Sequence, residues 1–104
     1  MTLREFDAAL KARCSDVYEL AAPKGLQQYA VWHKYGVQHA YGDDHNAADL
    51  PRVQIDILSQ QNDSIYAEDI CAALWGMDIP YMVVSDGYDP DYNAYRTILQ
   101  LVVI

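Results

Sequence analysis

Residues 52–104 read RVQIDILSQQNDSIYAEDICAALWGMDIPYMVVSDGYDPDYNAYRTILQLVVI, and this stretch decides the fold. Every second residue from Val53 to Ile57 is apolar, which is typical of a half-buried strand. The next apolar residues recur at helical spacing: Ala67, Ile70, Cys71 and Leu74. We therefore expect a strand followed by a helix, with Asp63 or Ser64 as the N-cap and Gly76 as the stop.

Two further strands are expected after this helix. Pro80 prevents the helix from continuing, and apolar residues alternate from Ile79 to Val83. Residues 89–92, Asp-Pro-Asp-Tyr, suit a type I turn. From Thr97 to Ile104 both sets of alternate residues are mostly apolar, so the last strand is either central in the sheet or covered by a partner.

The start of the chain predicts a second helix. Thr2 and Glu5 have capping-box spacing, and the apolar residues that follow recur at helical spacing. The helix should run over about 3–14, and residues 17–20 form a short extended piece after it.

The middle of the chain predicts a long strand. Period-two alternation runs over 29–41, and Gly36 in its middle makes this stretch either one bent strand or a hairpin. Residues 42–51 are a polar loop. We therefore expect a single domain over 1–104 of the α+β class: a mainly antiparallel sheet of about four strands with two helices packed on one face.

The chain is strongly acidic. Its net charge is −8, from 15 acidic residues and 7 scattered basic ones. Nucleic-acid binding relies on clustered Lys and Arg, so the composition argues against binding to phosphate backbones and against binding to an anionic membrane surface. The negative charge either serves solubility alone or forms a surface that repels DNA, so that DNA passes without binding.

The cysteines and the start of the chain bear on the compartment. Cys14 and Cys71 fall among apolar residues on expected helix faces, with no spacing for zinc or a redox pair. The start, MTLREFDAALKAR, has no apolar signal-peptide core, and no run approaches 18 apolar residues. We expect a soluble protein made in a reducing cytoplasm.

Residues with metal-ligand or catalytic chemistry are scattered. The candidates for a metal site are His33, His39, His45, Asp43, Asp44 and Asp49. His33 and His39 share a strand face, but they lie about 20 Å apart along an unbent strand. No zincin, EF-hand, nucleophile-elbow or Gly-rich phosphate-loop spacing is present. We predict no catalytic residue, no metal and no cofactor; a small acidic metal-binding or hydrolase domain is the alternative.

The chain contains nine tyrosines, three of which flank the acidic turn: Tyr88, Tyr92 and Tyr95. Tyrosine is enriched where a partner covers a surface. The same rings are also suited to completing a thin core, and the sequence leaves both interpretations open.

The order of the sequence pieces carries a family resemblance. The pieces are the N-terminal helix, AAPKG followed by QQYAVWHKYG, an acidic loop, VQIDILSQ, SIYAEDICAALWG, IPYMVV, the YDPDYNAYR turn and TILQLVVI. In this order, over nearly the whole chain, the sequence resembles the small tail-terminator and tail-completion proteins of long-tailed bacteriophages and prophages, also called head–tail joining proteins. Other head–tail connector and minor capsid components share this size and element order, and they are the alternative.

The resemblance implies a structural virion protein and no enzymatic activity. Such proteins assemble as rings, usually hexamers, on the last ring of the tail tube, where they stop polymerisation and present a surface to the head connector. DNA passes through the central hole without sequence-specific binding. The implied partners are copies of the chain, the major tail tube protein and the head connector protein, with no membrane. The implied location is the head–tail interface of the virion, and the bacterial host cytoplasm during assembly.

We expect the contacts of such a ring at the sheet edges and in two long loops, 42–51 and 86–95, because edge strands seek partners. The predicted interface residues are Asp43, Asp44, Tyr88, Asp89, Tyr92 and Arg96. Arg96 lies in a carboxylate-rich stretch, so it pairs either with a neighbouring subunit or within its own chain.

Overall fold

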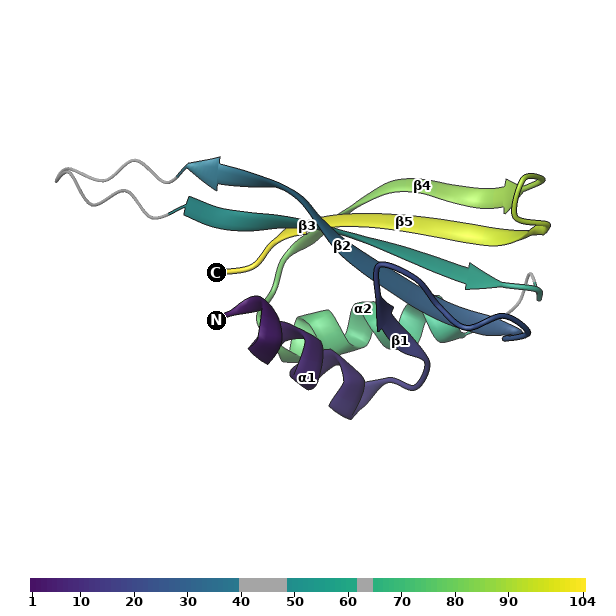
Figure 1. The fold of residues 1–104 in the computed structure, drawn as a ribbon, viewed down its shortest axis with the longest axis horizontal. Coiled ribbons are helices and arrows are strands. Elements are labelled where there is room, and N and C mark those ends of the chain that lie inside the picture. Colours follow the sequence, from purple (N-terminus) through teal and green to yellow (C-terminus); the bar gives the residue numbers. More distant parts are fainter. Residues whose placement is uncertain (40–48, 62–64) are drawn as a thin grey trace, which may run out of the picture.

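The computed structural model describes residues 1–39, 49–61 and 65–104. The helices and strands of this part are α1 (Leu3–Arg13), β1 (Val17–Glu19), β2 (Gln28–His39), β3 (Asp49–Ser59), α2 (Tyr66–Gly76), β4 (Tyr81–Asp89) and β5 (Ala94–Val102). The strands form one sheet in the order β1-β2-β3-β5-β4. Both helices lie on the same face of this sheet (Figure 1), which confirms the predicted α+β class and its two-layer packing.

The sheet has five strands rather than about four. The extra strand is the short extended piece after α1, which pairs in parallel with β2 and places Val17 opposite Ala30. The other three pairings are antiparallel. β5 lies between β3 and β4, so the apolar last strand is an inner strand of the sheet, the first of the two predicted arrangements.

The long strand in the middle of the sequence is one bent strand and not a hairpin. β2 continues past Gly36, and its register against β3 shifts there by a bulge. β3 begins at Asp49, so the end of the predicted 42–51 loop is strand; residues 42–48 of that loop lie outside the described residues. Pro51, which has no N–H to donate, lies in β3 just outside the ladder with β5, and its carbonyl accepts from the Val103 amide at 3.0 Å.

The helix termini follow the predicted signals in part. The Thr2 hydroxyl accepts a hydrogen bond from the Glu5 amide, and the Glu5 carboxylate accepts one from the Thr2 amide, so the capping box is confirmed. The predicted N-caps of α2, Asp63 and Ser64, lie outside the described residues. Gly76 is the last residue of α2, but the left-handed backbone falls at Asp78, where φ is 56°.

The core lies between the two helices and the inner face of the sheet. α1 contributes Phe6 and Leu10, which are fully buried. The buried residues of α2 are Tyr66, Ile70, Ala73 and Leu74, and those of the two central strands include Val53, Ile55, Ile57, Leu99 and Leu101. The Tyr66 hydroxyl donates to the backbone carbonyls of Ser15 and Asp16, and burial raises the pKa of this phenol. These hydrogen bonds connect α2 to the residues that follow α1.

One part of the sheet leaves the body of the molecule. β2 and β3 pair with each other as far as the His39–Asp49 pair, whereas β5 pairs with β3 only as far as Arg52 and the Val103 amide donates to the Pro51 carbonyl just beyond it. We call this end of the β2–β3 ladder, residues 34–39 with 49–52, the arm. Figure 1 shows it projecting beyond the helices. Among the described helices, neither is long and apolar enough to span a membrane.

Candidate interaction surface

Arg96 links the β4–β5 hairpin to the centre of the sheet. Its Nη2 donates to Asp56 Oδ2 at 2.7 Å, and its Nη1 donates to Asp89 Oδ2 at 3.0 Å. The three side chains are only 17–21% exposed. The Tyr92 ring covers the guanidinium, with 4.7 Å between Arg96 Cζ and the ring centroid. Arg96 therefore pairs within its own chain, and its predicted role in a subunit contact stays a prediction.

The charges of this cluster stabilise one another. Burial opposes the charged form of Arg96, but the hydrogen bonds to Asp56 and Asp89 outweigh it, so the pKa of Arg96 is raised. The hydrogen bond from Arg96 lowers the pKa of Asp89, aided by the backbone amide of Asp91. Both groups therefore stay ionised at neutral pH, and the cluster favours the folded hairpin.

The lowered pKa of Asp89 predicts a contribution to acid sensitivity. A carboxyl whose pKa is lower in the folded than in the unfolded chain stabilises the fold above its ordinary pKa of about 3.9. That stabilisation is lost as the pH falls through the lower, folded value. We expect the free energy of unfolding to fall between about pH 5 and pH 2, and to fall less steeply in Asp89→Asn. Urea denaturation across this pH range measures both slopes.

Asp91→Asn is the matched control for this experiment. Asp91 is exposed and lies in the same turn, and it contacts Asp89 through its backbone amide, which the substitution keeps. Its pH dependence should follow that of the unchanged protein. If the free energy of unfolding fell equally steeply with pH in Asp89→Asn and in the unchanged protein, the contact between Asp89 and Arg96 would make no contribution to the pH dependence of stability.

The predicted loop 86–95 is mostly strand. β4 continues to Asp89 and β5 begins at Ala94, so the turn is confined to the four residues between them. The amide of Tyr92 donates to the carbonyl of Asp89 at 3.2 Å, as expected of a turn over 89–92. The hairpin is held together because the Tyr88 ring packs edge-on against Tyr95, with centroids 5.2 Å apart.

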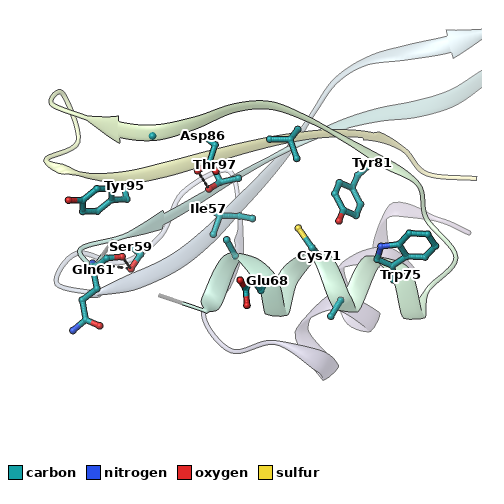
Figure 2. Close-up of a pocket in the computed structure, with 14 residues that line it drawn as sticks. Ile57, Ser59, Gln61, Glu68, Cys71, Trp75, Tyr81, Asp86, Tyr95 and Thr97 are labelled. Carbon is teal, nitrogen blue, oxygen red and sulfur yellow. Dashed lines mark hydrogen bonds between the residues drawn. The ribbon is translucent and has the colours of Figure 1, made fainter. Parts of the chain in front are cut away.

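A second feature is an open groove between α2 and the β4–β5 hairpin (Figure 2). Its volume is about 810 Å³. The helix side presents Cys71 and Trp75, and the sheet side presents Ile57, Tyr81 and Thr97 (Figure 2). The groove forms because α2 packs beneath β3, whereas β4 at the sheet edge extends past the helix layer.

The lining of the groove combines large apolar side chains with acidic ones. Trp75 is 74% exposed and Val83 is 52% exposed, although both are large apolar side chains. The charged residues in its lining are Glu68 and Asp86, and none of the residues that line it is basic. Asp86 is positioned by the hydroxyl of Thr97, which donates to it at 3.0 Å. Such a surface suits an apolar segment that carries positive charge.

The structure brings four of the six predicted interface residues together. Tyr88, Asp89, Tyr92 and Arg96 all lie at the β4–β5 turn, and Tyr88 and Tyr92 are about half exposed. Asp43 and Asp44 lie outside the described residues. The tyrosines fall into both predicted categories. Tyr66 is buried in the core, whereas Tyr88 and Tyr92 are not buried.

Sequence reasoning missed the groove. Trp75 falls off the apolar stripe of α2, and the run Met82-Val83-Val84 puts large apolar side chains on both faces of an edge strand. Either signal could have indicated an uncovered surface. Asp56 was also missed, since its pairing with Arg96 joins residues 40 positions apart.

The candidate metal ligands are dispersed or outside the described residues. His33 is half-buried, and its ring packs edge-on against Tyr35 with centroids 6.5 Å apart. His45 is outside the described residues, as are Asp43 and Asp44. In the part of the chain that the structure describes, no group of three or more His, Cys, Asp or Glu side chains could hold a metal ion.

Comparison with known proteins leaves the site to be interpreted from its own geometry. No protein-family model matches the chain, and a search of curated proteins finds no match. The fold and the surface define an α+β domain with an uncovered sheet edge, an apolar groove beside that edge and a projecting two-stranded arm.

Proposed function

We propose that the chain is a structural protein of a bacteriophage or prophage virion, a tail terminator. It caps the tail tube as a ring, as hexamers of this kind do, ends polymerisation of the tube and joins the tail to the head. The family resemblance of the sequence motivates the proposal, and the surface described above supports it.

The observation that carries the proposal is the cluster of exposed large apolar side chains along the edge strand β4. These side chains are Met82, Val83, Val84 and Tyr88, each between 49% and 61% exposed. An uncovered edge with apolar side chains on both faces favours association with another chain. A ring supplies such a neighbour to every subunit, because a head-to-tail interface closes when its rotation closes.

The charge of the chain supports the same function. With a net charge of −8, the lining of a ring built from this chain repels the phosphate backbone and lets DNA pass without retention. The remaining partners are then protein surfaces: the last ring of the major tail tube protein on one side and the head connector protein on the other.

Electron microscopy of particles made with and without this protein tests the proposal. Without it, we expect overlong tails or finished tails that never join heads. Tails of normal length on filled capsids would overturn the proposal.

A pair of variants then tests the surface that carries it. The double variant Met82→Ser/Val84→Ser should fail to restore joined particles, because it removes apolar area from the β4 edge. Leu20→Ser is the control, since Leu20 is 74% exposed but lies after β1, at the opposite side of the sheet. It should restore joined particles fully.

A further inference from the structure

The arm is a structural element without a core of its own. Among the described residues, its strands pair only with each other from the Gln38–Leu50 pair outward, because β1 pairs with residues 30–32, β5 stops at Arg52 and Val103 reaches only the Pro51 carbonyl. Tyr35 and Val37 are each 38% exposed there. A two-stranded hairpin is marginally stable in water unless its apolar side chains pack on something. The arm is therefore built to lie against another surface.

The groove beside β4 has the complementary properties. It has room for several side chains, its lining includes exposed apolar side chains, and β4 is paired on one side only among the described strands. An extended segment that lies there pairs its backbone with β4 and places alternate side chains in the groove. The groove requires an occupant that is strand-like, partly apolar and not acidic.

The described charges at the base of the arm are opposite to those of the groove. The exposed charged side chains described at the base of the arm are basic, namely Lys34 and Arg52, and Arg52 lies over the Tyr35 ring at 5.1 Å. The charged side chains of the groove are acidic, namely Glu68 and Asp86. In a chain with 15 acidic and 7 basic residues, a basic pair next to exposed apolar side chains is a distinctive feature. The attraction between these opposite charges favours contact between the arm and the groove and selects the register of that contact.

We propose that the arm of one copy binds in the groove between α2 and β4 of the next copy. The contact is head-to-tail, because arm and groove are different surfaces, so it generates rings or open chains and not closed dimers. The inference deepens the proposed function, since it rests on that ring and names the contact between its subunits.

A disulfide experiment tests the contact directly. Cys71 lies in the groove and is half-buried, whereas Cys14 is buried and its thiol donates to a carbonyl of α2. A thiol introduced by Val37→Cys should form disulfides with Cys71 of another copy under mild oxidation. We expect at least tenfold more linked product than from Lys24→Cys, an exposed position far from the arm, and the products should continue past the dimer on a non-reducing gel.

Charge reversal then identifies the attraction. Lys34→Glu/Arg52→Glu on the Val37→Cys background should reduce the linked product severalfold, and so should Glu68→Lys/Asp86→Lys. Mixing the arm-reversed protein, which carries Val37→Cys, with a groove-reversed protein that lacks Val37→Cys should restore the yield, because a linked product between the two then requires a reversed arm in a reversed groove. Circular dichroism of each variant verifies that the fold is kept.

The outcomes separate this inference from the proposed function. A linked ladder with normal phage assembly in the absence of the protein would uphold the contact and overturn the tail-terminator function. Linkage no greater than that of Lys24→Cys, a product that stops at the dimer, or linkage unaffected by charge reversal would overturn the contact. None of these three results would alter the interpretation of the tail lengths seen by electron microscopy.

Discussion

Replacing Trp32 with alanine is expected to lower the free energy of unfolding by about 3–5 kcal/mol, the range for removing a large aromatic side chain from a core. Trp32 is only 2% exposed at the middle of β2. Its ring meets Phe6 of α1 edge-on, with centroids 5.5 Å apart. Its indole N–H donates to the Asp7 carboxylate at 2.9 Å, so the substitution also removes this hydrogen bond and leaves the carboxylate with Lys11. Urea or thermal denaturation measures the loss.

The chain offers a matched control, since it has two tryptophans. Trp75 is 74% exposed, so Trp75→Ala should change the free energy of unfolding by no more than about 0.5 kcal/mol. Trp32→Phe keeps a ring against Phe6 and loses the N–H donor, and its cost should fall between the two alanine variants. If Trp32→Ala and Trp75→Ala proved equally mild, the packing of α1 on the sheet would be wrong.

The behaviour of β2 shows how far the sequence predicts this fold. Period-two alternation identified a strand, and a glycine at its middle indicated a bend, which the structure shows as a bulge. The alternation alone could not say which set of residues faces the helices. The buried set contains Ala30 and Trp32, whereas the other set, with Val31 and His33, is only half-buried because no described element covers that side of the sheet.

The candidate surface was less predictable for a physical reason. Local signals such as the Asp89-Pro90 turn depend on neighbouring residues, and the structure has this turn where it was predicted. The groove depends on where α2 packs relative to the sheet edge, which long-range contacts decide. Trp75 and Val83 line one groove only because β4 returns past the helix. The pairing of Arg96 with Asp56 likewise depends on the register of β5 against β3.

Arg96→Met is expected to lower the free energy of unfolding by about 2 kcal/mol. Exposed ion pairs contribute little, whereas breaking a fully buried pair costs about 3–5 kcal/mol, and the mostly buried Arg96 lies between these limits. The substitution leaves two carboxylates close together with no cation between them. Methionine keeps much of the apolar stem, so the loss reports on the charge and the hydrogen bonds. Arg96→Lys should also destabilise, because an ammonium cannot reach both carboxylates with the fork geometry of a guanidinium.

The triple variant Arg96→Met/Asp56→Asn/Asp89→Asn decides between two physical explanations of that loss. If the cost arises from leaving carboxylates uncompensated, neutralising them should restore more than half of the lost stability. If Arg96 acts mainly by packing under Tyr92, with 4.7 Å from Cζ to the ring centroid, the triple variant should remain as unstable as Arg96→Met. We expect the first result, because both guanidinium nitrogens that donate in the cluster are aimed at the carboxylates and the closer contact is 2.7 Å. Denaturation at neutral pH measures the difference in the free energy of unfolding.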